Sequence, residues 1–314
     1  YVKFGRILAI LFAVLCIGGS LGGGNMFQSN QTLEALGSVN PFFSEYNWVF
    51  GILLACLVGA VIIGGIRRIA EVTSRVVPTM CLAYVVSALY IIITNIDRVP
   101  DIIRLIFSQA LNGDAVYGGV LGIMIIGITR AAFSNEAGIG SAAIAHSAAK
   151  TEEAAREGIV SMIGPFIDTV IICSMTALVV LLTGAYNDPA LAGKGTAMTA
   201  SAFGSAIPGA QFVLAIVVCL FAYSTMISWE YYGERAWEYL FGNQYLIIFR
   251  VIFVAFVFLG SVTKLSNVID FSDLMILSMA FPNIVGGIVL SPQIKKCLDA
   301  YWQSYKSGQM KRYR

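Results

Sequence analysis

The stretch that decides the fold is Ile128-Thr-Arg-Ala-Ala-Phe-Ser-Asn-Glu-Ala-Gly-Ile-Gly-Ser141. It places a cation, Arg130, an anion, Glu136, an amide, Asn135, and two glycines inside one long apolar segment, 116–148. An ionised side chain at the centre of a bilayer costs roughly 2.5–3.5 kcal/mol on insertion scales. A continuous helix facing lipid therefore cannot carry this stretch. We predict that the helix is interrupted here and that Arg130 and Glu136 face protein or water, where they are able to pair with each other.

The composition supports lipid as the solvent of this chain. Of its 314 residues, 58% are hydrophobic and 12% are charged, about half the charged fraction of an average soluble domain, and the mean hydropathy is +0.79. The net charge is only +2. The basic residues lie between apolar segments rather than in a stripe with interleaved aromatic residues, so nucleic acid is not expected as a partner.

Long apolar segments predict an all-α integral membrane protein. About 20 apolar residues are needed to cross a bilayer as a helix. We predict eight crossings, at 7–34, 47–66, 77–96, 116–148, 157–184, 207–232, 246–264 and 267–291. Residues 100–112 repeat apolar positions at helical spacing and carry charges on the opposite face, which predicts a helix lying along the membrane interface.

The distribution of basic residues predicts the orientation. With eight crossings both ends of the chain lie on one side, and that side holds 15 of the 20 Lys and Arg residues, against four on the other side and Arg130 within a span. Cytoplasmic loops carry the excess of Lys and Arg in membrane proteins. We therefore expect both termini of this chain in the cytoplasm of a cell whose plasma membrane it spans. The chain starts at Tyr1 rather than Met, and we expect that an N-terminal part precedes it.

The interrupted helix has a chemistry of its own. Gly138 and Gly140 allow the backbone to unwind between two half-helices. Unwound carbonyl groups can replace the hydration shell of a sodium ion, and the N-terminus of a half-helix presents N–H groups to a carboxylate. A zwitterionic amino acid bound together with sodium requires both.

The first span contributes two amides. Its glycine-rich stretch, Gly18–Gly24, is typical of close helix packing. Asn25 and Gln28 are different, because an amide inside a membrane needs partners for its donors and its acceptor. We predict that Gln28 faces a ligand, and we keep Asn25 as a structural or coupling residue.

The sixth predicted span ends with Phe221-Ala-Tyr-Ser-Thr-Met-Ile-Ser-Trp-Glu-Tyr-Tyr232. Thr225 and Trp229 are four residues apart and share one helical face. Ser224 or Thr225 could supply oxygen ligands to a cation, although Ser and Thr in membrane helices often only bond the carbonyl of the preceding turn. In the fifth span, Asp168 needs a partner or a proton, and we keep open whether it serves cation coupling or helix docking.

At this point the residues resemble the alanine or glycine:cation symporters, also called sodium:alanine symporters, almost from end to end. The stretches that carry the resemblance are Gly24–Gln28, Phe133–Ala142, Ile144–His146, Ala149–Thr151, Phe166–Thr169, Phe221–Thr225 with Trp229, and Tyr232–Glu234. Ala143 stands where many relatives have proline.

The resemblance implies a LeuT-type fold, in which two five-helix repeats of inverted topology enclose a site at the middle of the membrane. The chain 1–314 then forms one transporter domain that comprises core helices three to ten. Residues 1–115 form the remainder of the first repeat, 116–291 the second repeat and 292–314 a basic cytoplasmic tail. The first core helix would be absent, and with it a Gly-x-Gly-Asn break, so this chain alone should not transport.

For the site, the resemblance implies a substrate pocket formed by Gln28, Phe133, Thr225 and Trp229, with Ser224 and Thr225 as sodium ligands. The expected function is sodium-coupled symport of alanine or glycine by alternating access, with no cofactor besides the coupling ion. Proton coupling through Asp168 or Glu136 is the alternative. An ion channel is more distant, because one chain with a single dense break supplies no symmetric filter. A membrane enzyme lacks a catalytic constellation here.

Overall fold

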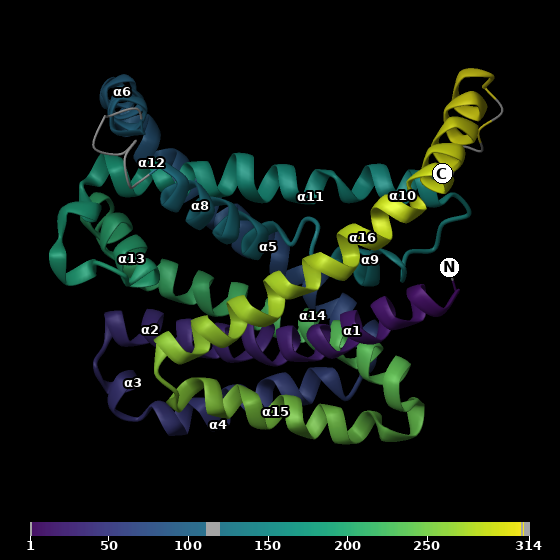
Figure 1. The fold of residues 1–314 in the computed structure, drawn as a ribbon. Coiled ribbons are helices and arrows are strands. Elements are labelled where there is room, and N and C mark those ends of the chain that lie inside the picture. The colour runs from purple at the N-terminus through teal and green to yellow at the C-terminus, as the bar shows by residue number, and fades with distance from the viewer. Residues whose placement is uncertain (1, 111–119, 309, 311–314) are drawn as a thin grey trace.

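The computed structural model describes residues 2–110, 120–308 and 310, and the regular elements in this part of the chain are helices (Figure 1). The α-helices are α1 (Val2–Leu21), α2 (Phe27–Val39), α3 (Phe42–Glu45), α4 (Asn47–Ile62), α5 (Gly65–Thr94), α6 (Val99–Ala110), α8 (Val120–Asn135), α9 (Ser141–His146), α10 (Ala154–Ser161), α11 (Ile163–Pro165), α12 (Ser174–Thr183), α13 (Gly195–Ala206), α14 (Ala210–Phe241), α15 (Leu246–Val262) and α16 (Leu265–Lys306). Two π-helical segments, η1 (Gly22–Met26) and η3 (Phe166–Cys173), lie within longer helices, and short 3₁₀ turns are η2 (Ile96–Arg98), η4 (Ala185–Asn187), η5 (Pro189–Leu191) and η6 (Asn243–Tyr245).

In the described part of the chain, six helical segments are long and apolar enough to cross a membrane, which agrees with the prediction of an all-α membrane protein. They are Lys3–Val39, Gly65–Thr94, Ala154–Thr183, Ala210–Phe241, Asn243–Val262 and Leu265–Lys306. The two other predicted crossings are shorter: 47–66 contains the 16-residue α4, and 116–148 contains α8 and α9. Residues 116–119 lie outside the described part of the chain, and the number of crossings stays a prediction.

Helix boundaries differ from the predicted spans mainly at their polar ends. Helix α14 continues to Phe241, about two turns beyond the predicted end at residue 232. Helix α16 continues through Pro282 and Pro292 to Lys306, so that much of the predicted tail is helical. Hydropathy predicts where lipid ends, whereas helical hydrogen bonding continues into water when the residues there favour helix. The predicted interfacial helix corresponds to α6.

The helices form a bundle with α1 and α14 near its centre (Figure 1). Helix α1 packs against α14 and α16, α14 also packs against α2 and α5, and α15 packs against α4. Both ends of the chain lie at one end of the bundle, and α3, α6 and α13 lie at the other (Figure 1).

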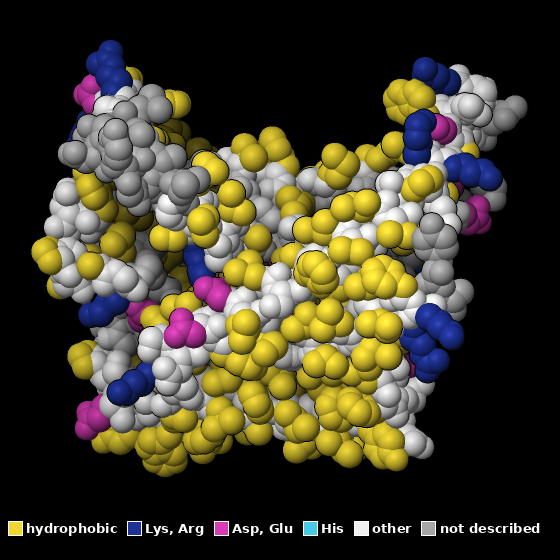
Figure 2. Space-filling view, viewed as in Figure 1, with side chains coloured by type: hydrophobic (Ala, Val, Ile, Leu, Met, Phe, Trp, Pro, Cys, Tyr) yellow, Lys and Arg dark blue, Asp and Glu magenta, His cyan; other side chains and the backbone are white. Residues whose placement is uncertain are grey.

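The surface is apolar where a bilayer would surround it. Figure 2 shows a broad hydrophobic face, with most charged side chains gathered toward its two ends. Large apolar side chains such as Ile63, Met162 and Ile288 are about two-thirds exposed or more. Contiguous apolar patches of this extent are not tolerated on soluble monomers, and they mark contact with membrane or partner.

Small residues allow the central helices to approach closely. A Cβ atom on Gly24 would lie 2.3 Å from Cγ of Trp229, and one on Gly23 would lie 2.2 Å from Cδ1 of Ile276. A Cβ atom on Gly260 of α15 would lie 2.6 Å from the backbone oxygen of Met26 in η1. The interpretation of the first-span glycines as packing residues is confirmed.

Gly260 provides a direct test of this packing. We expect Gly260→Ala to destabilise the protein by about 1–3 kcal/mol, since overpacking against rigid backbone forces the helices apart. Thermal unfolding in detergent measures the effect. Gly286→Ala is the matched control, because a Cβ atom at Gly286 of α16 meets no atom within 4 Å. An equal loss of stability in both variants would contradict this account.

Candidate functional site

The predicted interruption is present and short. Helix α8 ends at Asn135, and α9 begins at Ser141. Between them, Glu136, Gly138 and Gly140 have φ angles of +56°, +85° and +103°, a region that L-residues other than glycine rarely adopt. Residues 129–135 remain helical, so the backbone leaves helical hydrogen bonding only at 136–140.

Glu136 holds the interruption against two helices. Its Oε1 accepts a hydrogen bond of 2.7 Å from the indole Nε1 of Trp229 in α14, and its Oε2 accepts one from the hydroxyl of Ser141 at the start of α9. Both carboxylate oxygens therefore have donors. The strained backbone at Glu136 is compensated by these bonds, which is the pattern expected where strain has a functional use.

Arg130 has a partner that the sequence pattern did not indicate. Its guanidinium pairs with the carboxylate of Asp273 in α16 and lies over the ring of Phe133, 5.6 Å from the centroid. The suggested pairing of Arg130 with Glu136 is wrong, because Arg130 pairs with Asp273 while both oxygens of Glu136, beyond the end of α8, accept from Trp229 and Ser141. The last predicted span, 267–291, contains two acidic residues, Asp270 and Asp273, and these were the sequence signal that could have indicated a partner for Arg130.

The end of α8 docks on the π-helical segment η3. The hydroxyl of Ser134 donates to Oδ2 of Asp168 at 2.7 Å, and Nδ2 of Asn135 donates to the hydroxyl of Thr169 at 2.8 Å. Oδ1 of Asn135 accepts the backbone N–H of Ala137 at 2.8 Å and so turns the chain out of the helix. These contacts support the docking role of Asp168, and a coupling role stays a prediction.

Two further contacts were not found from the sequence. Nδ2 of Asn283 in α16 donates to the backbone oxygen of Gly138 at 2.8 Å. Phe12 of α1 packs so close to Gly140 that a Cβ atom there would lie 2.4 Å from its ring. A polar amide inside the predicted last span was the available signal for Asn283, whereas Phe12 looks like any other apolar residue of a span.

A cavity of about 380 Å³ lies beside α8, which contributes Arg130 to its lining. Gln28, Arg130 and Phe221 are among its lining residues, together with Gln31, Thr196 and Ala222. Nε2 of Gln28 also donates to the backbone oxygen of Gly23 at 3.0 Å. The structure thus brings the predicted Gln28 and Arg130 to one cavity.

The predicted aromatic residues Phe133 and Trp229 are not among the lining residues of this cavity. Phe133 contacts the ring of Phe27, which does line the cavity, in an edge-to-face pair at 5.3 Å. Trp229 is buried against Gly24 and bonds Glu136. The two rings thus flank the glycine-rich turn η1 from α8 and from α14.

Asn25 faces a neighbouring helix. Its Nδ2 donates to the backbone oxygen of Phe253 in α15 at 2.7 Å, and Ser29 donates to the oxygen of Val257 at 2.7 Å. Both side chains are buried. Asn25 therefore attaches the π-helical turn of the first span to α15, which supports a structural role.

The hydroxyl groups of Ser224 and Thr225 each donate to the backbone oxygen of Phe221 at 2.9 Å. This is the bonding to the preceding turn that the sequence left open as an alternative. A hydroxyl oxygen that donates its proton still has lone pairs for a cation. Within the described residues, no group of three or more His, Cys, Asp and Glu side chains is placed to hold a metal ion.

The interrupted span, the cavity beside it and the apolar exterior define a multi-pass membrane transporter. The model of the sodium:alanine symporter family matches residues 3–314, and the chain belongs to this family of transporters.

Curated relatives agree with this assignment. The chain is 38% identical to the sodium/alanine symporter AgcS of Methanococcus maripaludis over 91% of this chain and 63% of the relative. It is 35% identical to the amino-acid carrier protein AlsT of Bacillus subtilis over 96% of this chain and 64% of that protein. It is 31% identical to a sodium/proton-dependent alanine carrier protein of Bacillus sp. strain PS3, over 83% of this chain and 62% of that protein. The chain thus spans less than two-thirds of the length of these relatives.

The bond between Trp229 and Glu136 gives a prediction for stability. We expect Trp229→Phe to lower the free energy of unfolding of the ligand-free protein by about 1–3 kcal/mol, since it leaves a carboxylate oxygen without its donor. Thermal unfolding without sodium or amino acid measures this. The control, Trp302→Phe, changes a half-exposed tryptophan of α16 and should shift stability by less than about 0.5 kcal/mol. Unchanged stability of the Trp229 variant would refute the proposed support of the interruption.

Proposed function

We propose that the protein containing this chain is a sodium-coupled symporter of small neutral amino acids, alanine or glycine, that works by alternating access. The observation that carries this proposal is the interruption at 136–140, where Glu136 bonds to Trp229 of α14. Helix α8, which leads into the interruption, packs on the glycine-rich turn η1 through Phe133 and lines a cavity through Arg130. Freed backbone groups at such a point can satisfy both a cation and a zwitterion.

The substrate would bind between the first span, α8 and α14. Gln28 offers an amide that can reach a carboxylate or an ammonium group, since it is both donor and acceptor. A Cβ atom on Gly23 would lie 3.0 Å from the ring of Phe133, and one on Gly24 would lie 2.3 Å from Cγ of Trp229, so both rings flank η1 closely. Two rings this close leave room for a short side chain. We therefore propose walls that select alanine or glycine, formed by Phe133, Thr225 and Trp229.

Sodium would bind on α14 through oxygen atoms. Hard cations prefer hydroxyl and carbonyl oxygens, and Ser224 and Thr225 supply two hydroxyl groups with remaining lone pairs. Backbone carbonyl groups would supply the rest of the coordination. The ion would then stabilise α14, which also carries Trp229, and so favour substrate binding.

Arg130 and Asp273 would act as a latch over the site. Their ion pair connects α8 to α16, and Arg130 lines the cavity. Its guanidinium also covers Phe133. Movement of α8 away from α16 would break the pair and open the route from one side of the membrane.

The architecture that we propose is the LeuT-type inverted repeat, with 1–115 in the first repeat, 116–291 in the second and 292–314 as a cytoplasmic tail. The plasma membrane is the proposed location, with both ends of this chain in the cytoplasm. The start of α1 and the end of α16 lie at the same end of the bundle, which supports placing both on one side of the membrane (Figure 1).

Proton coupling is the second candidate. A relative is named a sodium/proton-dependent alanine carrier protein, and the spans of this chain contain carboxylates at Glu136 and Asp168 that hydrogen-bond to hydroxyl or indole groups rather than to cations. A carboxylate without a cation beside it can exchange a proton more readily than one in an ion pair.

Uptake by the whole protein that the gene encodes tests the coupling ion. We expect proteoliposomes to accumulate alanine when sodium is present outside, because a membrane potential of about 100 mV contributes about 2.3 kcal/mol for each entering sodium ion. That energy supports a substrate gradient of more than about tenfold. Replacement of sodium by potassium should abolish the accumulation. Undiminished uptake in potassium would reject sodium coupling.

The proposed sodium ligand Thr225 can be tested separately. We expect Thr225→Val to raise the sodium concentration for half-maximal uptake by about tenfold, which corresponds to about 1.4 kcal/mol for the lost oxygen ligand. The matched control is Thr79→Val on α5, because that hydroxyl also bonds the preceding turn, at 2.9 Å to the oxygen of Arg75, but is exposed. If both variants keep the sodium dependence of the unmodified protein, Thr225 is not a ligand.

A further inference from the structure

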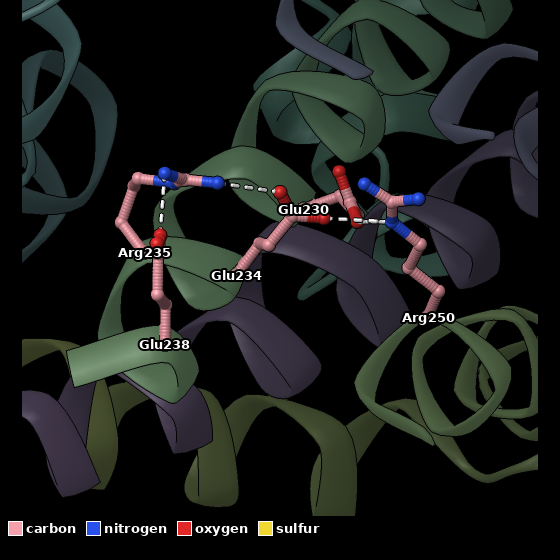
Figure 3. A network of polar contacts seen from close by, with 5 residues as sticks. All are labelled: Glu230, Glu234, Arg235, Glu238 and Arg250. Atoms are coloured by element: carbon pink, nitrogen blue, oxygen red, sulfur yellow. Dashed lines mark hydrogen bonds and ion pairs between the residues drawn. The ribbon is translucent and has the colours of Figure 1, made fainter. Parts of the chain in front are cut away.

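A network of five charged residues connects α14 to α15 (Figure 3). We call it the ionic network; it consists of Glu230, Glu234, Arg235 and Glu238 of α14 and Arg250 of α15. Nη2 of Arg235 donates to Oε1 of Glu234, and Nε of Arg250 donates to Oε2 of Glu234, each at 2.7 Å. Glu234 thus has a cation on each of its two oxygens.

Glu230 is the member without a hydrogen bond to a cation. Nε of Arg250, its nearest cationic atom, lies 3.7 Å from Oε1 of Glu230 and is directed at Glu234 instead. Oε1 of Glu230 has no hydrogen-bond partner among the described residues, although the side chain is only 1% exposed. A buried carboxylate in this situation is destabilised as an anion.

The charges of the network do not balance. Three carboxylates face two guanidinium groups, so the fully ionised network has one negative charge in excess. The charged groups that face Glu230 are Glu234 and Arg235 from its own helix and Arg250 from α15. Helix α1, which packs on the same part of α14, presents the neutral Ser20 to Gly233. In the described surroundings of Glu230, no further cation offsets the excess charge.

We propose that Glu230 is a proton-binding site. One proton on its carboxyl group removes the excess charge of the network and creates an O–H donor toward the neighbouring carboxylate of Glu234. The ligand is therefore a hydrogen ion, held between the two carboxylates at positions 230 and 234. This inference rests on the proposed transport function and adds a second coupling ion to it.

The network offers a route for this proton from the protein surface. The exposed fractions of the side chains fall from 38% at Arg235 and 26% at Glu238 to 5% at Glu234 and 1% at Glu230. The three glutamates follow each other at intervals of four residues and so lie on one face of α14. A proton that reaches Glu238 can move inward along this face to Glu230.

Glu230 is also connected to the candidate substrate site. Its chain neighbour Trp229 donates to Glu136 at the interruption. Protonation changes how strongly α14 is attached to α15 through Arg250, and α14 carries Trp229, Thr225 and Ser224. Binding of the proton can therefore alter the site without direct contact with the substrate.

The test is alanine uptake by proteoliposomes of the whole protein at constant sodium, driven by a pH gradient of one unit. We expect the gradient to raise accumulation by the unmodified protein by about tenfold if one proton moves with each substrate. Glu230→Gln, which imitates the protonated carboxyl group, should keep sodium-driven uptake and lose this response. Glu71→Gln, which changes an exposed carboxylate of α5 that pairs with Arg75 outside the network, is the control and should keep it.

The outcomes separate this proposal from the proposed function. Sodium-driven uptake that ignores the pH gradient in the unmodified protein overturns the proton site and leaves sodium symport intact. A Glu230→Gln variant that responds like the unmodified protein also overturns it. Absence of any alanine uptake by the unmodified protein overturns the proposed function instead.

A second measurement decides the matter if Glu230→Gln does not fold. Infrared difference spectra of the whole protein between acid and alkaline buffer report the carbonyl stretch of protonated carboxyl groups. Glu230→Asp keeps a carboxyl group and should shift one such band relative to the unmodified protein, while Glu238→Asp should leave it unchanged. Identical bands in the unmodified protein and in Glu230→Asp would show that Glu230 takes up no proton.

Discussion

The structure depends on how the backbone groups of a broken helix find hydrogen-bond partners inside a membrane, where lipid offers none. A bilayer supplies neither donors nor acceptors, so each backbone group released at 136–140 must find a partner within the protein. Asn135 accepts one backbone N–H and Asn283 donates to one carbonyl oxygen, while Glu136 joins α14 to the start of α9. These partners come from α8, α14 and α16, which is why the bundle must assemble around the break before the break can be stable.

Close approach of the surrounding helices is the second requirement. Side chains such as Trp229 reach the break only because the first span presents glycine to them, at Gly23 and Gly24. The π-helical turn η1 shifts the register of the first span at the same place, and Asn25 then bonds to α15 rather than into the cavity. Insertions of this kind inside α-helices are frequent at functional sites. Neighbouring residues of η1 therefore have different roles: Gly23 and Gly24 allow close packing, and Asn25 attaches the turn to α15.

Charged residues inside the spans follow one pattern. Arg130 pairs with Asp273, Asp168 accepts from Ser134, and Glu234 accepts from Arg235 and Arg250. Apart from the contact of Glu234 with Arg235, which lies within α14, each of these contacts joins two helical segments. Glu230 departs from the pattern, because its oxygen Oε1 has no hydrogen-bond partner in the described part of the chain. In a low-dielectric interior, such a group is stable mainly when it carries a proton or when a partner moves toward it.

The sequence by itself determined that the chain is an all-helical membrane protein, that the helix in 116–148 is broken at its glycines and that the first-span glycines pack. These conclusions depend on the free energy of transferring each segment into lipid. The residues of a segment determine that free energy locally. Tertiary structure alone decided which partners satisfy the buried polar groups. Arg130 bonds Asp273, 143 positions away, rather than the nearby Glu136, and the network around Glu234 recruits Arg250 from the next helix. Such choices depend on the relative rotation and spacing of helices that are distant in sequence, and no local pattern encodes these.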